Sequence, residues 1–146
     1  MSVLPVTLLV VAKAPEPGRA KTRLAATVGD RVAADIAAAA PLDTLDAVAA
    51  VPVAARVVPL TGDLDAAASG AEIRQRLESF TVIAQRGDNF GDRLANAHAD
   101  AGMGSGGHPV LQIGVDTPQV TADLLAACAR RLLEVRAVLG LACDGG

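Results

Sequence analysis

Apolar residues gather in five short runs along the chain, and longer stretches rich in alanine and polar residues separate these runs. Each run has the length of a β-strand. The first is continuous and rich in β-branched residues, which is typical of a strand buried in a parallel sheet. We interpret all five as strands, and they are Val6–Ala12, Ala54–Leu60, Phe80–Ala84, Pro109–Val115 and Ala137–Ala142.

The stretches between the runs predict helices, and several begin at residues that favour helix starts. Asp30 is expected to cap an Ala-rich helix that extends through Ala50, and Pro41 should kink or split this helix. Thr121 is expected to cap a helix that extends to about Leu133. The other helices are expected from Arg19 or Ala20 to Gly29, from Asp63 to Ser79 with Gly70 as a point of division, and from Asn89 to Ala101.

Strands that alternate with helices indicate a mostly parallel sheet with right-handed crossovers. We therefore expect one Rossmann-like α/β domain over residues 1–146, with three layers in the order α/β/α. Ligands bind such sheets at the carboxyl ends of the strands. Four polar residues lie at or just past the end of a predicted strand, and they are Lys13, Gln85, Asp116 and Asp144. Four strands would therefore bring polar groups to the same edge of the sheet. No helix follows the last run, so we expect the domain to lack its C-terminal part.

Composition narrows the classes of function. Phe80 and Phe90 are the only aromatic residues, which argues against a module that stacks bases on aromatic side chains. A net charge of −3 argues against general binding of nucleic acid. No apolar run reaches the roughly 18 residues of a membrane span, and the N-terminus lacks the pattern of a secretion signal. Cys128 and Cys143 form no metal pair or disulfide framework, so we expect a cytoplasmic protein.

The loop after the first strand is the main candidate for binding. Both lysines of the chain, Lys13 and Lys21, lie in it together with Arg19 and Arg23. Cations between a strand end and a helix start suit a phosphate, because backbone N–H groups are free there and the helix dipole favours an anion. Gly18 would let the backbone approach that anion closely. The loop lacks the glycines of GxxxxGK[ST] and of GxGxxG, and a solvated basic loop is the alternative.

Two carboxylates follow later strands. Asp116 lies in the segment GVDTP and Asp144 in the segment DGG. A carboxylate at a strand tip suits a hard divalent cation, which would bridge the diphosphate of a nucleotide. The alternatives are a turn or helix cap for Asp116 and a simple β-turn for Asp144. His98 and His108 have no Ser or Cys partner at a strand end, so we assign them no catalytic role.

Four segments occur in order at the strand ends, namely AKAPEPGRAKTRLA, QRGDNFGDRLANA, IGVDTP and LACDGG. Together they resemble the small bacterial GT-A-type glycosyltransferases found as radical-SAM/selenodomain-associated transferases. That family belongs to the nucleotide-diphospho-sugar transferase superfamily and is related to nucleotidyltransferases that make dinucleotide cofactors. The resemblance spans almost the whole chain. It implies a nucleotide-diphospho-sugar transferase fold, a bound nucleoside diphosphate and a divalent cation, Mg²⁺ or Mn²⁺.

The resemblance also implies roles for individual residues. The residues that would contact the phosphates are Lys13, Arg19, Lys21 and Arg23, and Gly18 lies in the same loop. The residues that would lie near the base or ribose are Gln85, Gly87 and Arg93. Asp116 would bind the metal, and Asp144 would face the sugar or acceptor and supply a second metal contact. Similar proteins usually continue beyond the DGG segment, where acceptor-binding elements are expected.

The leading hypothesis is a metal-dependent glycosyltransferase that takes a nucleotide sugar and an acceptor of unknown identity. A cation held by Asp116, together with the Lys/Arg cluster, would stabilise the negative charge that develops on the leaving diphosphate. One alternative is a nucleotidyltransferase that acts on a phosphorylated acceptor. Another is a nucleotide-binding domain without catalytic activity. The base, the sugar, the acceptor and the oligomeric state stay open at this point.

Overall fold

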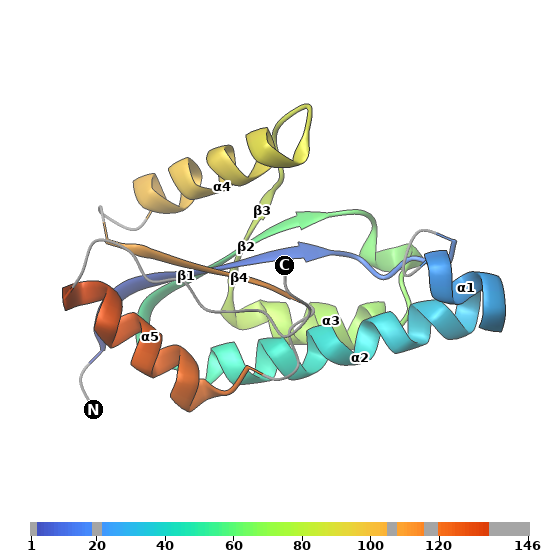
Figure 1. Ribbon diagram of the computed structural model, residues 1–146, viewed down its shortest axis with the longest axis horizontal. Helices are drawn as coiled ribbons and strands as arrows, with labels where there is room; N and C mark the ends of the chain where they lie inside the picture. Colours follow the sequence, from blue (N-terminus) through green and yellow to red (C-terminus); the bar gives the residue numbers. More distant parts are fainter. Residues whose placement is uncertain (1–2, 19–21, 105–107, 116–119, 135–146) are drawn as a thin grey trace.

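The computed structural model describes residues 3–18, 22–104, 108–115 and 120–134. Four strands form one sheet in the order β3-β2-β1-β4, and all neighbouring strands are parallel (Figure 1). The strands are β1 (Leu4–Lys13), β2 (Val53–Thr61), β3 (Thr81–Ala84) and β4 (Val110–Gly114). These four confirm four of the five predicted strands. The fifth, Ala137–Ala142, lies outside the described residues.

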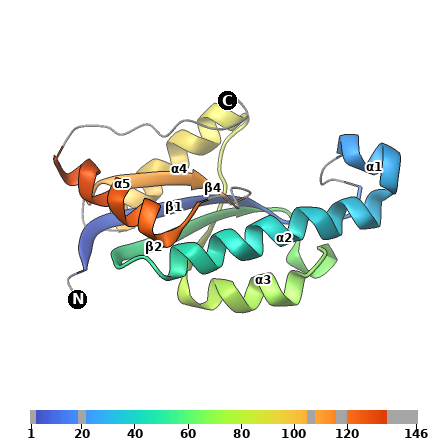
Figure 2. The ribbon, with the colours of Figure 1, turned by 60° about the horizontal axis from the view of Figure 1, so that its bottom comes forward.

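Helices cover both faces of the sheet. One face carries α2 (Asp30–Ala49), α3 (Gly70–Arg76) and α5 (Ala122–Glu134), whereas α4 (Phe90–Gly104) covers the other (Figures 1 and 2). The short helix α1 (Thr22–Val28) leads into α2. Two 3₁₀ turns, η1 (Leu64–Ala66) and η2 (Leu77–Ser79), flank α3. The predicted three-layer α/β/α arrangement is confirmed.

The apolar run of β1 is continuous because both faces of this strand are covered. Alternate residues such as Leu8 and Val10 pack toward α2, α3 and α5, where they join a large cluster of buried side chains. Leu9, between them, packs toward α4 with Val57 and Ala97. Side chains of successive strand residues point to opposite faces, so a strand between two helical layers needs apolar residues at every position.

Two predictions about α2 are corrected. Of the two expected effects of Pro41, a kink or a split, the split is wrong, because the helix continues from Asp30 to Ala49. The Pro41 ring is buried, and its packing at the end of the sheet offsets the hydrogen bond that a proline cannot donate. The N-cap is Gly29 instead of Asp30, and its backbone φ of +91° favours glycine. Asp30 occupies the first helical turn, where its charge complements the helix dipole.

The segment predicted as one helix from Asp63 to Ser79 forms three short pieces, η1, α3 and η2. Gly70 is the point of division, as expected, and the reason is lack of space. A Cβ atom on Gly70 would lie 2.0 Å from the carbonyl oxygen of Leu64. The predicted cap of α5 is confirmed, because the Thr121 hydroxyl accepts a hydrogen bond from the N–H of Leu124 at 3.1 Å.

Candidate functional site

The strand register brings polar residues to the carboxyl edge of the sheet. Lys13, at the end of β1, lies beside Thr61 at the end of β2. Ala84 at the end of β3 lies beside Leu60, so Gln85 follows at the same edge. The predicted convergence of Lys13 and Gln85 is therefore confirmed. Asp116 and Asp144, predicted at the same edge, lie outside the described residues.

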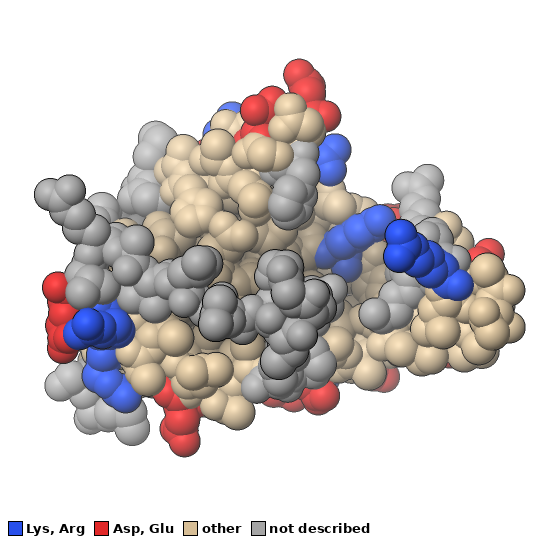
Figure 3. Space-filling view, in the orientation of Figure 1, with Lys and Arg blue, Asp and Glu red and all other residues tan. Residues whose placement is uncertain are grey.

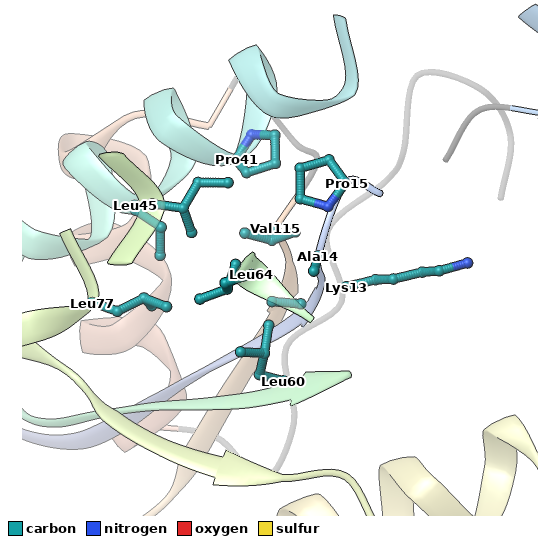
Figure 4. A pocket seen from close by; sticks show the side chains of 11 residues that line it. Lys13, Ala14, Pro15, Pro41, Leu45, Leu60, Leu64, Leu77 and Val115 are labelled. Carbon is teal, nitrogen blue, oxygen red and sulfur yellow. The ribbon is translucent and has the colours of Figure 1, made fainter. Parts of the chain in front are cut away.

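Lys13 points to the face of the sheet that α4 covers. It lies four residues after Leu9, which packs toward α4, and alternate strand residues share a face. Its side chain is exposed and extends away from the apolar residues on the opposite face (Figure 4). The polar part of the candidate site is therefore on the α4 side of the sheet edge.

On the opposite side, a small apolar hollow lies beneath the loop after β1. Among the residues that line it are Pro15, Pro41, Leu45, Leu64 and Val115 (Figure 4). These side chains offer no donor or acceptor to a phosphate. The hollow thus explains how the loop packs on α2 and the β2–α3 connection, and the predicted contacts with phosphate concern the other side, to which the Lys13 side chain extends.

The first half of the loop after β1 is held by backbone contacts with the β2–α3 connection. The Ala14 N–H donates to Thr61 O at 2.9 Å, and the Ala68 N–H donates to Pro15 O at 3.0 Å. The Glu16 carboxylate accepts a hydrogen bond from the Asp63 N–H at 3.3 Å. These contacts fix the direction in which the chain leaves the sheet.

Basic side chains gather beside α1 and the end of β1 (Figure 3). Lys13 and Arg23 are exposed, and Gly18 has a backbone φ of +82°, which favours glycine. Arg19 and Lys21, the other two predicted phosphate ligands, lie outside the described residues. Of the four predicted cations, the structure thus describes Lys13 at the end of β1 and Arg23 on α1, and both are exposed.

Gln85 connects the ends of three strands. Its side-chain Nε2 donates to Ala12 O at 3.0 Å and to Pro59 O at 3.1 Å, and its backbone N–H donates to Leu60 O at 3.4 Å. The contacts therefore run from the end of β3 across β2 to β1. Both N–H groups of the amide are engaged in this way, so a ligand that touched Gln85 would meet the carbonyl oxygen of its side chain.

The loop after Gln85 is held by the first half of α4. Asn89 Oδ1 accepts a hydrogen bond from the Asp92 N–H at 2.8 Å, which caps the helix. Asn96 Nδ2 donates to Arg86 O at 2.8 Å, and Arg93 Nε donates to Gly87 O at 3.3 Å. Gly87 has a φ of +137°. The predicted residues Gly87 and Arg93 thus contact each other, and Arg93 is an exposed residue.

The ion pair between Arg86 and Asp100 ties the same loop to the second half of α4. Arg86 Nη2 lies 2.7 Å from Asp100 Oδ1, and Arg86 Nε lies 3.1 Å from Asp100 Oδ2. The hydrogen bond from Arg86 holds the pKa of Asp100 below its ordinary value. Sequence reasoning missed Asn89, Asn96 and Asp100. The pattern of Asn89 and Asp92 at the start of a predicted helix was the available signal for the cap.

A metal site is not evident in the part of the chain that the structure describes. No group of three or more His, Cys, Asp or Glu side chains there could hold a metal ion. Val115, the residue before Asp116, donates its N–H to Val11 O at 3.0 Å, so β4 stays paired up to that point. A carboxylate is the right type of ligand for Mg²⁺ or Mn²⁺, and Asp116 remains a predicted ligand.

Comparisons with known proteins agree with this fold. The model of a family described as uncharacterized proteins conserved in bacteria (DUF2064) matches residues 44–146. The chain belongs to this family. It also resembles the crystal structure of a "putative nucleotide-diphospho-sugar transferase" from Desulfovibrio desulfuricans, with a TM-score of 0.73 and 26% sequence identity. The similarity covers 91% of the chain and 55% of that structure, so the chain spans about half the length of this relative.

No relative was found among curated proteins. The family and the structural neighbour together support the nucleotide-diphospho-sugar transferase superfamily and its Rossmann-like fold. Within the described residues, every helix is too short or too polar to cross a membrane.

Proposed function

We propose that this member of the DUF2064 family is a metal-dependent transferase domain that binds a nucleotide sugar and transfers its glycosyl group to an acceptor. The observation that carries the proposal is the basic loop at the carboxyl edge of a parallel sheet. In folds of this type, ligands bind at that edge. The similarity to a structure described as a "putative nucleotide-diphospho-sugar transferase" supports a diphosphate as the anion that the loop binds.

The proposed reaction breaks the bond between the anomeric carbon of the sugar and the diphosphate oxygen. A new bond forms between that carbon and an acceptor oxygen, whose proton passes to the solvent. The nucleoside diphosphate leaves with the electron pair, so negative charge grows on its outer phosphate. Lys13 and Arg23 would stabilise this charge, with Arg19 and Lys21 as further predicted contacts.

Asp116 and Asp144 are the residues proposed to hold Mg²⁺ or Mn²⁺, which would offset charge on the diphosphate when bound. Gly18 would let the loop backbone approach the phosphate, because its positive φ turns the chain at a position without a side chain. Gly87 and Arg93 are proposed to line the neighbouring part of the site, near the base or ribose.

Thermal unfolding with a panel of nucleoside diphosphates and nucleotide sugars, each with and without Mn²⁺, tests the proposal. A ligand that binds the native state raises the midpoint of unfolding. We expect a rise with at least one nucleotide, and a larger rise when Mn²⁺ is present. A panel without any rise would overturn the proposal.

Lys13→Ala and Lys21→Ala test the loop itself. Loss of a charged hydrogen bond to phosphate should weaken nucleotide binding by about tenfold or more. Arg130→Ala is the matched control, because it removes an exposed cation from α5, away from the loop. Calorimetric titration of all three variants gives the affinities. Equal affinities of the loop variants and the control would remove the loop from the site.

The acceptor chemistry separates glycosyl transfer from the other candidate reactions. Release of nucleoside diphosphate from a nucleotide sugar identifies glycosyl transfer. Release of pyrophosphate from a nucleoside triphosphate in the presence of a phosphorylated acceptor would instead identify nucleotidyl transfer. Binding without turnover in both assays would identify a domain that only binds the nucleotide.

A further inference from the structure

The side chain of Gln85 makes an unusual contact with the backbone of the sheet. It starts at the end of β3, and its Nε2 lies 3.0 Å from Ala12 O in β1 and 3.1 Å from Pro59 O in β2. Both acceptors are main-chain carbonyl oxygens of other strands. Because two acceptors surround one atom, that atom must be the amide nitrogen, which has two hydrogens to donate.

Pro59 explains why the sheet benefits from such a donor. It is buried in β2, which lies between β1 and β3, and proline has no N–H to give to a neighbouring strand. Pro59 therefore gives no donor to the strand beside it, and the hydrogen bonding of this part of the sheet depends more on other donors. The Gln85 amide adds two N–H groups nearby, one to Pro59 O and one to Ala12 O.

The second donor acts on the start of the basic loop. Ala12 O belongs to the peptide group that also contains the nitrogen of Lys13, so a hydrogen bond to this oxygen restrains the orientation of that peptide. One peptide further on, the Ala14 N–H is held by Thr61 O at 2.9 Å. The backbone of Lys13 is thus restrained on both sides.

We propose that Gln85 is a positioning residue that fixes the Ala12–Lys13 peptide and thereby directs Lys13 toward the phosphate of the nucleotide. This inference rests on the proposed function, because it takes phosphate binding by the loop as its purpose. It gives Gln85 a different role from contact with the base or ribose. The amide hydrogens are already engaged by the sheet, so only the side-chain oxygen is left for such a contact.

A double-mutant cycle between Gln85 and Lys13 distinguishes the two roles. Gln85→Met keeps the length of the side chain and removes the amide, and we expect it to weaken nucleotide binding by about tenfold. In the background of Lys13→Ala, the same change should have little further effect, because the group that it positions is missing. Two effects that simply add would overturn the inference and favour direct contact between Gln85 and the nucleotide.

Arg76→Ala is the matched control for stability. Arg76 lies on α3 and is bonded to Asp46 on α2, so its loss removes an ion pair on the face of the sheet opposite α4. We expect Arg76→Ala to lower the unfolding midpoint slightly while leaving the nucleotide affinity unchanged. If Gln85→Met does not fold, Gln85→Asn, which keeps the amide on a shorter side chain, replaces it in the cycle.

Amide hydrogen exchange without any nucleotide separates failure of this inference from failure of the proposed function. In Gln85→Met we expect faster exchange at Ala14, whose N–H bonds to Thr61, and unchanged exchange at Ala33 in α2. Unchanged exchange at Ala14 would overturn the positioning role whatever the nucleotide does. Faster exchange at Ala14 in a protein that binds no nucleotide would support the restraint and refute only the proposed function.

Discussion

At the scale of single residues, the backbone of the loop between β3 and α4 depends on Gly87. Its φ of +137° lies in a region that residues with a side chain rarely adopt. A Cβ atom at this position would also lie 2.8 Å from the Arg93 nitrogen and 2.8 Å from the Asp92 Cβ. Two independent constraints, backbone conformation and space, therefore require glycine here.

Comparison of Gly87→Ala with Gly29→Ala separates these constraints. Gly29 has a φ of +91° but nothing within 4 Å of an added Cβ, so only backbone strain opposes alanine there. We expect Gly29→Ala to lower the free energy of unfolding by about 1–3 kcal/mol and Gly87→Ala to lower it by more. Urea unfolding followed by circular dichroism measures both. An equal loss in the two variants would contradict the predicted overlap at Gly87.

Sequence reasoning located Lys13 and Gln85 at the sheet edge because each follows directly after an apolar run. It did not find the bond from Gln85 to the backbone of β1. Every residue has a carbonyl oxygen, and nothing in the sequence marks Ala12 and Pro59 as the acceptors. Those partners are brought to Gln85 by the strand order and register alone.

At the scale of elements, the end of α2 is capped by a side chain from the next strand. Arg56 on β2 donates from Nε to Val48 O at 3.0 Å, and its Nη2 donates to the carbonyl oxygens of Ala49 and Val51. The last carbonyls of a helix have no partner within it, and a positive charge there complements the helix dipole. Arg56 thus joins the end of α2 to the sheet.

We expect Arg56→Met to lower the free energy of unfolding by about 1–2 kcal/mol, because the helix end loses a charged donor. Arg74→Met is the control, since Arg74 forms an exposed ion pair with Asp65 that should contribute less than about 1 kcal/mol. Chemical denaturation of both variants gives the comparison. A loss for Arg56→Met that is no larger than that for Arg74→Met would contradict the capping role of Arg56.

The ion pair between Arg86 and Asp100 gives the loop before α4 a dependence on pH. The pKa of Asp100 is lowered in the folded state, so the pair contributes stability above the ordinary pKa of an aspartate, about 3.9. That contribution is lost as the pH falls through the lowered pKa. We expect the unfolding midpoint of Asp100→Asn to be below that of the parent at pH 7. The two midpoints should converge below about pH 4, and a constant difference would contradict the assignment.

The helices show where prediction from sequence succeeds and where it fails. Thr121 was predicted correctly as a cap, because the hydroxyl of a cap residue bonds to a backbone N–H only a few residues further along the chain. The split expected at Pro41 does not occur, and local propensity could not show this, because it takes no account of the packing that buries the ring. The connection from η1 to α3 depends on the close approach of Gly70 to the carbonyl oxygen of Leu64. The local sequence does not show that these two residues approach each other.

At the scale of the whole molecule, two clusters of buried side chains share the same sheet. Val57 belongs to the cluster on the α4 side and its neighbour Val58 to the larger cluster on the other side. A substitution that shifts one strand therefore alters the packing of the helices on both faces of the sheet. The three-layer architecture was predictable from the alternation of strands and helices, whereas the strand order β3-β2-β1-β4 came only from the structure.

We expect Val57→Ala and Val58→Ala each to lower the free energy of unfolding by about 2–3 kcal/mol. Both should shift one cooperative transition, because the sheet joins the two layers. The chain has no tryptophan or tyrosine, so circular dichroism and amide exchange are the suitable probes. A separate early transition of α4 in Val57→Ala would show that the two layers unfold independently.

The pairing of β1 with β4 has a consequence for synthesis of the chain. Thr7 pairs with Val110, so one edge of β1 meets its partner only after roughly 100 further residues have been made. At about 5–20 residues per second, the ribosome needs roughly 5–20 s to supply that partner. During this time a nascent apolar strand has an open edge, which is the kind of segment that aggregates or engages chaperones. Slower translation of α4 and its flanks should therefore lower the yield of native protein.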